Sequence, residues 1–405
     1  MSIHRYEEAF ESAKARIKKD KKISARNKEL ILNCISDLSL KNLSFPRLNR
    51  YMDVLKWLAL GTSKDLDKLN KQDLKNYVST IQQNKEYSPW TKQTYKVIIR
   101  KFFCWLNGID KPGQYPEIVE WINIAMKRSE MRLPADGDLI KQEDVIKMIK
   151  GAEHPRDKAF IAMLWETGAR IGEIGDLKVG TIKFDQHGAT LVLHGKTGSR
   201  SVRIIWSVPY LSTWLDNHPF KDNPQAPIWI KLTTRNKIEK MKYSGLATIL
   251  RRACRQGGIR KRVYPHLFRH SRATFLATHL TEFQMNQYLG WIQGSKMAAT
   301  YVHMNGKNLE SSILSLNGIK VEEKKENDEL KPRVCPRCEL VNPHDTVNCR
   351  RCGGLIDLKV AMELDEKHRQ EQELRSNADK VMDMLLKDRE VRSILMQKME
   401  GLRQF

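Results

Sequence analysis

The sequence has no run of about 18 consecutive apolar residues, the length that a helix needs to cross a bilayer. Its N-terminal segment contains acidic side chains and lacks the apolar stretch of a secretory signal peptide. Only seven cysteines occur in 405 residues, and Cys34, Cys104 and Cys254 each stand alone. Isolated cysteines are typical of a reducing compartment, where they act as small buried hydrophobes. These absences predict a cytoplasmic protein without a membrane-spanning part.

Acidic residues are too few to balance the basic ones, and the formal net charge is +23. The excess is +10 over residues 1–137 and +13 over residues 138–318, whereas residues 319–405 are neutral. A basic excess over two domain-sized segments indicates a polyanionic partner, because bound Lys and Arg displace the counterions condensed on nucleic acid. Charge alone also allows a generally basic, solvated surface.

A chain of this length is expected to form two or three domains. The first 130 residues show helical periodicity interrupted by short polar turns. The clearest helix is predicted over residues 90–107, because Ser88-Pro89 opens it and Gly108 closes it. One side of this helix is basic and could face either solvent or DNA; it consists of Lys92, Lys96, Arg100 and Lys101.

In the second half of the chain, the spacing of apolar residues changes from helical to strand-like once and then becomes helical again. Two β-branched runs, 189–193 and 201–206, flank a glycine-rich tip and predict a β-hairpin among helices. We therefore predict a mainly α fold with a small β-hairpin or sheet (α+β). The predicted segments are a helical domain (1–132), a second domain (138–318), a charged linker (319–332), a cysteine module (333–356) and an amphipathic helical tail (357–405).

Two short strings could bind or protonate a phosphate oxygen. Thr167-Gly-Ala-Arg-Ile-Gly-Glu173 offers the planar fork of Arg170, with Glu173 close enough to orient it, although a surface Arg-Glu pair is the plainer interpretation. Lys196 occupies the predicted hairpin tip, where its ammonium could protonate a leaving oxygen. Gly195-Lys-Thr does not indicate a nucleotide-binding loop, because that motif requires glycine where the chain has Thr190.

Two further strings add a histidine, an arginine and a tyrosine. In Tyr264-Pro-His-Leu-Phe-Arg-His, Pro265 can start a helix that places His266 and Arg269 three residues apart on one face, with His270 beside them. A helix start also attracts anions. Later in the chain, Trp291 and Tyr301 flank a short helix or turn. A tyrosine becomes nucleophilic only where cations stabilise the charge that develops on phosphate, and most tyrosines simply pack.

In this order the four strings resemble the tyrosine recombinase (integrase) family, whose pattern is Arg, Lys, His-x-x-Arg, His or Trp, and Tyr. The match spans about 135 residues and gives Arg170, Lys196, His266, Arg269, Trp291 and Tyr301. Most relatives have histidine in place of Trp291, and the interval to Tyr301 is one residue longer than in many bacterial members. The motif Gly-Trp-x-x-Gly-Ser-Lys-Met resembles archaeal members of the family more closely. Residues 1–132 resemble the core-binding domain of the family by layout only.

The resemblance implies a nucleoid-associated enzyme that clamps double-stranded DNA and assembles as a homo-oligomer, a tetramer in the synapse. Tyr301 would form a 3′-phosphotyrosyl bond, Arg170 and Arg269 would hold the phosphate with help from His266 and Trp291, and Lys196 would protonate the 5′ oxygen. The expected role is integration or excision of a mobile element. The alternatives are Xer-like resolution of chromosome or plasmid multimers and an inert DNA-binding regulator. The chemistry needs no cofactor.

The cysteine module has two Cys-x2-Cys pairs separated by ten residues: Cys335, Cys338, Cys349 and Cys352. Four thiolates at this spacing suit one structural zinc ion, whereas disulfides do not suit a reducing compartment. Three arginines beside them could contact phosphate, namely Arg337, Arg350 and Arg351. The apolar stripe of the tail predicts packing against a neighbouring protomer or against its own chain; it consists of Leu374, Ala378, Val381, Leu385, Val391, Leu395 and Met399.

Overall fold

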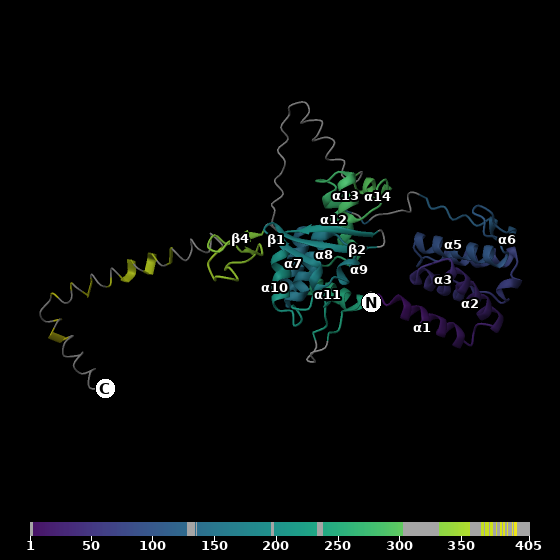
Figure 1. Ribbon diagram of the computed structural model, residues 1–405, viewed down its shortest axis with the longest axis horizontal. Helices are drawn as coiled ribbons and strands as arrows, with labels where there is room; N and C mark the ends of the chain where they lie inside the picture. Colours follow the sequence, from purple (N-terminus) through teal and green to yellow (C-terminus); the bar gives the residue numbers. More distant parts are fainter. Residues whose placement is uncertain are drawn as a thin grey trace, which may run out of the picture. The chain divides into compact units, whose positions relative to one another are not determined.

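The computed structural model forms two compact units (Figure 1). The first comprises Met1–Leu139, Ile171–Asp176 and Trp229–Thr248, and the second comprises Ile140–Arg170, Leu177–Ile228 and Ile249–Phe405. Within these limits the structure describes residues 3–127, 134, 136–195, 198–232, 238–302 and 332–356, and in the tail residues 366–367, 369–371, 373–375, 378, 381–382, 384, 387, 391 and 393–394. No helix in these ranges is long and apolar enough to cross a membrane.

Helices with apolar residues at helical spacing build the first unit. They are α1 (Tyr6–Lys19), α2 (Ala25–Leu40), α3 (Phe45–Leu60), α4 (Lys71–Gln83), α5 (Pro89–Leu106) and α6 (Glu117–Glu120), with the 3-10 turns η1 (Leu66–Lys68) and η3 (Asp136–Asp138). Leu48, Met52 and Leu55 of α3 are buried in a common core with residues of α2 and α5. Helix α5 confirms the helix predicted over 90–107, and the Ser88 hydroxyl caps it by accepting the Thr91 N–H at 3.2 Å.

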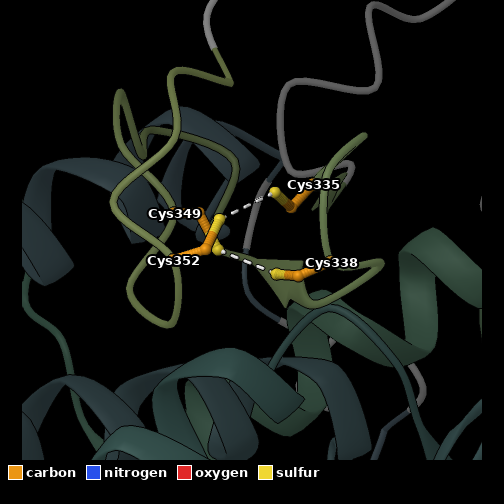
Figure 2. Close-up of side chains that lie close together, drawn as sticks. All are labelled: Cys335, Cys338, Cys349 and Cys352. Atoms are coloured by element: carbon orange, nitrogen blue, oxygen red, sulfur yellow. Dashed lines mark hydrogen bonds between the residues drawn. The ribbon is translucent and has the colours of Figure 1, made fainter.

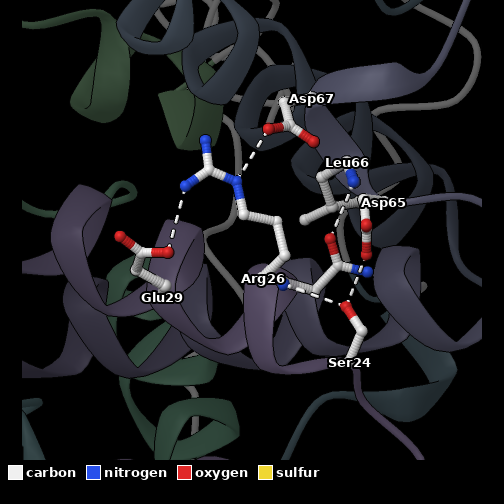
Figure 3. A network of polar contacts seen from close by, with 7 residues as sticks. Ser24, Arg26, Glu29, Asp65, Leu66 and Asp67 are labelled. Atoms are coloured by element: carbon white, nitrogen blue, oxygen red, sulfur yellow. Dashed lines mark hydrogen bonds and ion pairs between the residues drawn. The ribbon is translucent and has the colours of Figure 1, made fainter.

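A polar network joins the start of α2 to the turn η1 in the first unit (Figure 3). The Arg26 guanidinium binds Glu29 at 3.0 Å and Asp67 at 2.8 Å. The Ser24 hydroxyl donates to Asp65 at 2.5 Å, and the Leu66 N–H donates to the buried side chain of Asn27 at 2.7 Å. This network lets polar backbone near η1 be buried without losing its hydrogen bonds.

Helix α8 (Pro155–Thr167) is the central element of the second unit. Almost every residue of it is buried, and it packs against α7 (Gln142–Gly151), α10 (Val208–Asp216), α12 (Pro265–Leu276) and the sheet. Its middle, residues 159–165, is apolar on all sides, as expected for a helix at such a central position. The other helical elements of the second unit are η4 (Val179–Thr181), α13 (Glu282–Leu289) and α14 (Lys296–Val302), whereas α9 (Ile171–Gly175) belongs to the first unit and α11 (Tyr243–Gln256) is divided between the two.

The sheet of the second unit has three antiparallel strands in the order β1 (Ile182–Asp185), β2 (Gly188–Gly195) and β3 (Gly198–Ile204). Leu191 pairs with Val202, and both side chains are buried, because alternate residues of a strand share one face. The predicted hairpin is confirmed, whereas β1 adds a strand that the sequence did not predict. The protein is therefore mainly α with a small β-sheet, as its periodicity indicates.

The cysteine module contains the short antiparallel pair β4 (Arg333–Val334) and β5 (Val341–Asn342). It lies against α10 of the second unit. Nη1 of Arg350 donates to the Thr213 hydroxyl at 2.6 Å and to the Pro209 carbonyl at 3.1 Å, and Asp216 lies 4.0 Å away. Arg350 therefore binds α10, and the phosphate contact that the sequence allowed for it stays a prediction.

The predicted linker and much of the tail lie outside the described residues. The described tail residues are helical, and the side chains of Leu374 and Val381 are 70% and 52% exposed. Leu385, Leu395 and Met399 of the predicted stripe are not among them.

Candidate active site and cysteine cluster

A tight turn after α8 positions Arg170. The Thr167 hydroxyl accepts the Ala169 N–H at 3.2 Å, and Gly168 adopts a left-handed conformation with φ 55°. A Cβ on Gly168 would lie 3.1 Å from the Arg272 side chain, so glycine suits both the conformation and the space. This geometry explains Thr-Gly-x-Arg locally: the first two residues stop the helix, and the half-buried Arg170 follows. Glu173 is buried on α9. That it orients the Arg170 side chain stays a prediction.

Arg269 is held on α12 by two backbone carbonyls. One terminal nitrogen donates to the Gly168 carbonyl at 3.0 Å and the other to the Leu289 carbonyl at 2.7 Å. Its guanidinium also lies 5.2 Å from the ring centre of Trp291. The side chain is only 3% exposed, so a cation sits almost fully buried where α8 and α13 end. Helix C-termini favour a cation, because their last carbonyls lack helical partners.

Trp291 and Tyr301 stack on one another. Their ring centres are 5.6 Å apart and the ring planes differ by 7°. Gly290 ends α13 in a left-handed conformation, and the Trp291 N–H donates to the Asn286 carbonyl at 2.8 Å. Tyr301 on α14 is only 2% exposed, and burial raises the pKa of its phenol to about 12, although Arg269 acts to lower it.

The Tyr301 hydroxyl has a histidine partner that the sequence prediction left without a role. Nδ1 of His270 lies 2.5 Å from it. Burial first, and then His266 and Arg269, lower the pKa of His270 to about 4. The one available signal was the string His-x-x-Arg-His, in which His270 directly follows Arg269.

His266 lies one helical turn before His270, and their rings meet edge to face with centres 4.8 Å apart. Desolvation, Arg269 and Arg170, in that order, lower the pKa of His266. Arg170, His266, Arg269, Trp291 and Tyr301 are thus brought together in the second unit. Lys196 lies outside the described residues, although Gly195 pairs with Gly198 on either side of it.

The four cysteines converge at the end of the cysteine module (Figure 2). Their sulfur atoms all lie within 4.8 Å of one another, so they could hold one metal ion. Two tight turns present them: the Glu339 N–H donates to the Cys335 carbonyl at 2.9 Å, and the Gly353 N–H donates to the Cys349 carbonyl at 2.8 Å. Gly353 has φ 69°, which glycine adopts without strain.

The basic side of α5 is engaged within its own unit. Lys92 donates to the Gln82 carbonyl at 2.7 Å, and Arg100 lies 4.0 Å from the ring centre of Tyr115. Lys101 lies 3.6 Å from Asp110. These contacts cover neighbouring loops with the long side-chain stems, an arrangement that also leaves cationic ends near the surface.

Residues 139–308 match the model of the phage integrase family. XerA, a tyrosine recombinase of Pyrococcus furiosus, is 26% identical over 180 residues, which are 44% of this chain and 61% of that relative. The chain thus spans less than two thirds of that archaeal protein. XerC, a tyrosine recombinase of Lacticaseibacillus casei, is 23% identical over 266 residues, which are 63% of this chain and 85% of that relative.

Solved structures share the fold. The Tn1549 transposon integrase in complex with transposon right end DNA aligns with a TM-score of 0.54 and 15% identity, over 71% of this chain and 99% of that one. XerH bound to a palindromic difH substrate aligns with a TM-score of 0.53 and 17% identity, over 76% of this chain and 94% of that one. The matched domain and the ordered Arg, His-x-x-Arg, Trp and Tyr residues within it lead to one conclusion: residues 139–308 form a domain of the tyrosine recombinase (phage integrase) family.

Proposed function

We propose that the protein is a site-specific DNA recombinase that cuts and rejoins duplex DNA with Tyr301 as the nucleophile. The observation that carries this proposal is the setting of Tyr301: its hydroxyl lies 2.5 Å from Nδ1 of His270, and its ring stacks on Trp291, over which the Arg269 guanidinium lies. A buried phenol with a raised pKa is a poor nucleophile by itself. A phosphate held by arginines changes this, because the cations stabilise the negative charge of the transition state.

The mechanism transfers one phosphoryl group twice. The phenolic oxygen of Tyr301 attacks the scissile phosphorus, and the bond from phosphorus to the 5′ oxygen breaks. Arg170 and Arg269 bind the non-bridging oxygens, and His266 and Trp291 donate further hydrogen bonds. Lys196 gives a proton to the departing 5′ oxygen. The 5′-hydroxyl of a second strand then attacks the 3′-phosphotyrosyl bond and restores the phenol.

Double-stranded DNA is the proposed partner. The support is the net charge of +23, all of it within residues 1–318, together with the buried arginine site. Of the solved structures that share the fold, the transposon integrase is in complex with transposon right end DNA and XerH is bound to a palindromic difH substrate. Binding through many Lys and Arg residues predicts an affinity that falls steeply with salt concentration.

The biological role that we favour is integration or excision of a mobile element. Xer-like resolution of chromosome or plasmid multimers is the second candidate, and a specific observation supports it: the alignment with XerC extends over 266 residues, beyond the matched catalytic region. Sequencing the DNA that co-purifies covalently with the protein separates the two roles. Element ends favour integration, and a single chromosomal or plasmid site favours resolution.

The cysteine cluster is proposed to hold one zinc ion with a structural role. The four-thiolate donor set fits tetrahedral zinc, and so small a module has little core of its own. The chain is further proposed to act as a homo-oligomer on DNA, a tetramer in the synapse. The exposed apolar residues of the tail, such as Leu374 and Val381, support a contact between protomers.

The direct test uses a DNA duplex nicked near the cleavage site, which traps the covalent intermediate. Wild-type protein should form an adduct that migrates more slowly on a denaturing gel. Tyr301→Phe should bind the same DNA and form none, whereas Tyr243→Phe, the same change at a half-exposed tyrosine, should behave as wild type. Adduct formation by Tyr301→Phe at the wild-type level would assign the nucleophile elsewhere.

A further inference from the structure

His270 makes the shortest described contact of the proposed nucleophile. Its Nδ1 lies 2.5 Å from the Tyr301 hydroxyl, within hydrogen-bonding distance. The contact joins α12 to α14, which pack against each other within the second unit. Tyr301 is 2% exposed, so bulk water is kept from the hydroxyl and the imidazole is the acceptor at hand.

The two histidines of α12 face different tasks. His266 and His270 are four residues apart, so they lie on one face of the helix with their rings in edge-to-face contact. His266 is more exposed and is the one whose pKa responds to Arg170, the proposed phosphate ligand. His270 is turned toward the phenol. This division leaves His266 to the phosphate and His270 to the nucleophile.

The protonation states of Tyr301 and His270 suit proton transfer from the phenol to the imidazole. The charged groups acting on His270 are His266 and Arg269 of its own helix, and together with burial they keep its ring neutral near pH 7. Tyr301, facing it from α14, keeps its phenolic proton at that pH. A neutral imidazole has one nitrogen without hydrogen, which accepts a proton when it is the nitrogen facing the phenol.

We propose that His270 is the catalytic base that removes the phenolic proton of Tyr301 during attack on DNA. The Tyr301 O–H bond breaks and its proton binds Nδ1 of His270. The phenolic oxygen forms a bond to phosphorus, and the bond to the 5′ oxygen breaks. When a 5′-hydroxyl later attacks the phosphotyrosine, it gives its proton back to Lys196, and the imidazolium returns its own proton to the departing phenolate. The proposal rests on the proposed function, because it presupposes that Tyr301 is the nucleophile.

Binding of DNA increases the basicity of His270 at the moment when it is needed. In the DNA-free protein, the nearby cation of Arg269 opposes protonation of the imidazole. A phosphate bound by Arg269 brings negative charge next to that cation and offsets its effect. The same phosphate stabilises the imidazolium after the transfer. Substrate binding therefore favours loss of the phenolic proton.

The test compares two substitutions that preserve the polar character of the side chain. His270→Asn places an amide near the position of Nδ1, so it can hold the hydroxyl but cannot accept its proton. We expect its single-turnover cleavage rate on nicked DNA to fall by about 100-fold or more, the usual contribution of acid–base catalysis. His279→Asn, the same change at an exposed histidine just beyond α12, should cleave at the wild-type rate.

Chemical rescue separates a base from a positioning residue. Imidazole added to His270→Ala should restore cleavage, and a series of substituted imidazoles should restore it in proportion to their basicity. Retention of the wild-type rate by His270→Asn would overturn the proposal. So would a His270→Ala protein that binds DNA normally and gains nothing from any imidazole. If wild-type protein itself forms no adduct, the proposed function fails instead, so the two failures are distinguishable.

Discussion

The Arg200 side chain donates a hydrogen bond from Nε to the backbone carbonyl of Tyr288 at 2.9 Å. The contact ties strand β3, which leads from the hairpin tip, to the last turn of α13, which leads into Trp291. In the sequence, Lys196 precedes Arg200 by only four residues. Strand β3 is thus anchored to the same segment that positions Trp291, one of the stacked aromatic pair of the candidate active site.

Gly290→Ala should disrupt this anchor. A Cβ on Gly290 would lie 2.7 Å from Nη1 of Arg200, and φ is 66°. Gly294→Ala is the matched control, because its φ is 78° but a Cβ there meets nothing within 4 Å. Both changes incur backbone strain of roughly 1–2 kcal/mol, because an L side chain disfavours the left-handed conformation. Only Gly290→Ala also meets Arg200, so only it should slow adduct formation. Equal cleavage rates and equal melting temperatures for the two variants would show that the Arg200 contact is unimportant.

Replacing Arg170 and Arg269 in turn should separate effects on catalysis from effects on stability. Arg170→Ala should lower the cleavage rate by a factor on the order of 100 to 1,000, since it removes a charge-stabilising contact to the phosphate. Its melting temperature should change little, because the side chain is only half-buried. Arg269→Ala should lower both quantities, because it also strips hydrogen bonds from two buried carbonyls. Thermal denaturation and single-turnover cleavage measure the two effects, and an unchanged melting temperature for Arg269→Ala would contradict the structural part.

Arg350→Ala should release the cysteine module from α10. The side chain makes two hydrogen bonds to that helix, whereas the adjacent Arg351 is exposed and provides the matched control. Limited proteolysis should cut the module free faster in Arg350→Ala than in wild type or Arg351→Ala, with the bound metal content unchanged in all three. Identical digestion of all three proteins would show that Arg350 does not hold the module in place.

Loss of one metal ligand should unfold the cysteine module and leave the chemistry intact. We expect Cys338→Ser to form the Tyr301 adduct on nicked DNA but to assemble and recombine poorly, because a four-thiolate site loses its folding energy with one ligand. Deleting residues 319–405 should give the same result and should barely change the salt dependence of DNA binding, since this segment has no net charge. Light scattering and recombinant yield are the measurements. Full recombination by both proteins would rule out the assembly role.

The lowered pKa of His270 predicts how stability depends on pH. Burial, His266 and Arg269 hold it at about 4 in the folded chain, against about 6.5 for an unfolded histidine. The unfolded chain therefore takes up the proton first as pH falls. The stabilisation from the neutral ring is present above about pH 6.5 and is lost as pH falls toward 4. Between pH 7 and 5, the melting temperature of wild type should fall more than that of His270→Asn. Parallel pH profiles for the two proteins would contradict this.

Local patterns in the sequence were sufficient for much of the fold. The helix over 90–107 was predictable because its cap, its periodic apolar residues and its terminal glycine act within a few residues of one another. The hairpin was predictable because two β-branched runs flank a glycine-rich tip. Strand β1 was not, since its exposed residues show no alternation and its pairing with β2 depends on contacts beyond its own sequence.

The sequence by itself determined the family of residues 139–308, the ordered residues Arg170, His266, Arg269, Trp291 and Tyr301, and the four-cysteine cluster, because each depends on residue type and spacing. Only the tertiary structure decided which partner each group meets. Helical spacing places His266 and His270 on one face of α12, and the packing of α14 against that helix selects His270 as the partner of Tyr301. The same holds for Arg350, whose charge alone suggested phosphate but whose position against α10 gives it backbone and hydroxyl oxygens to bind. Such choices depend on contacts between residues far apart in the chain, which no local pattern encodes.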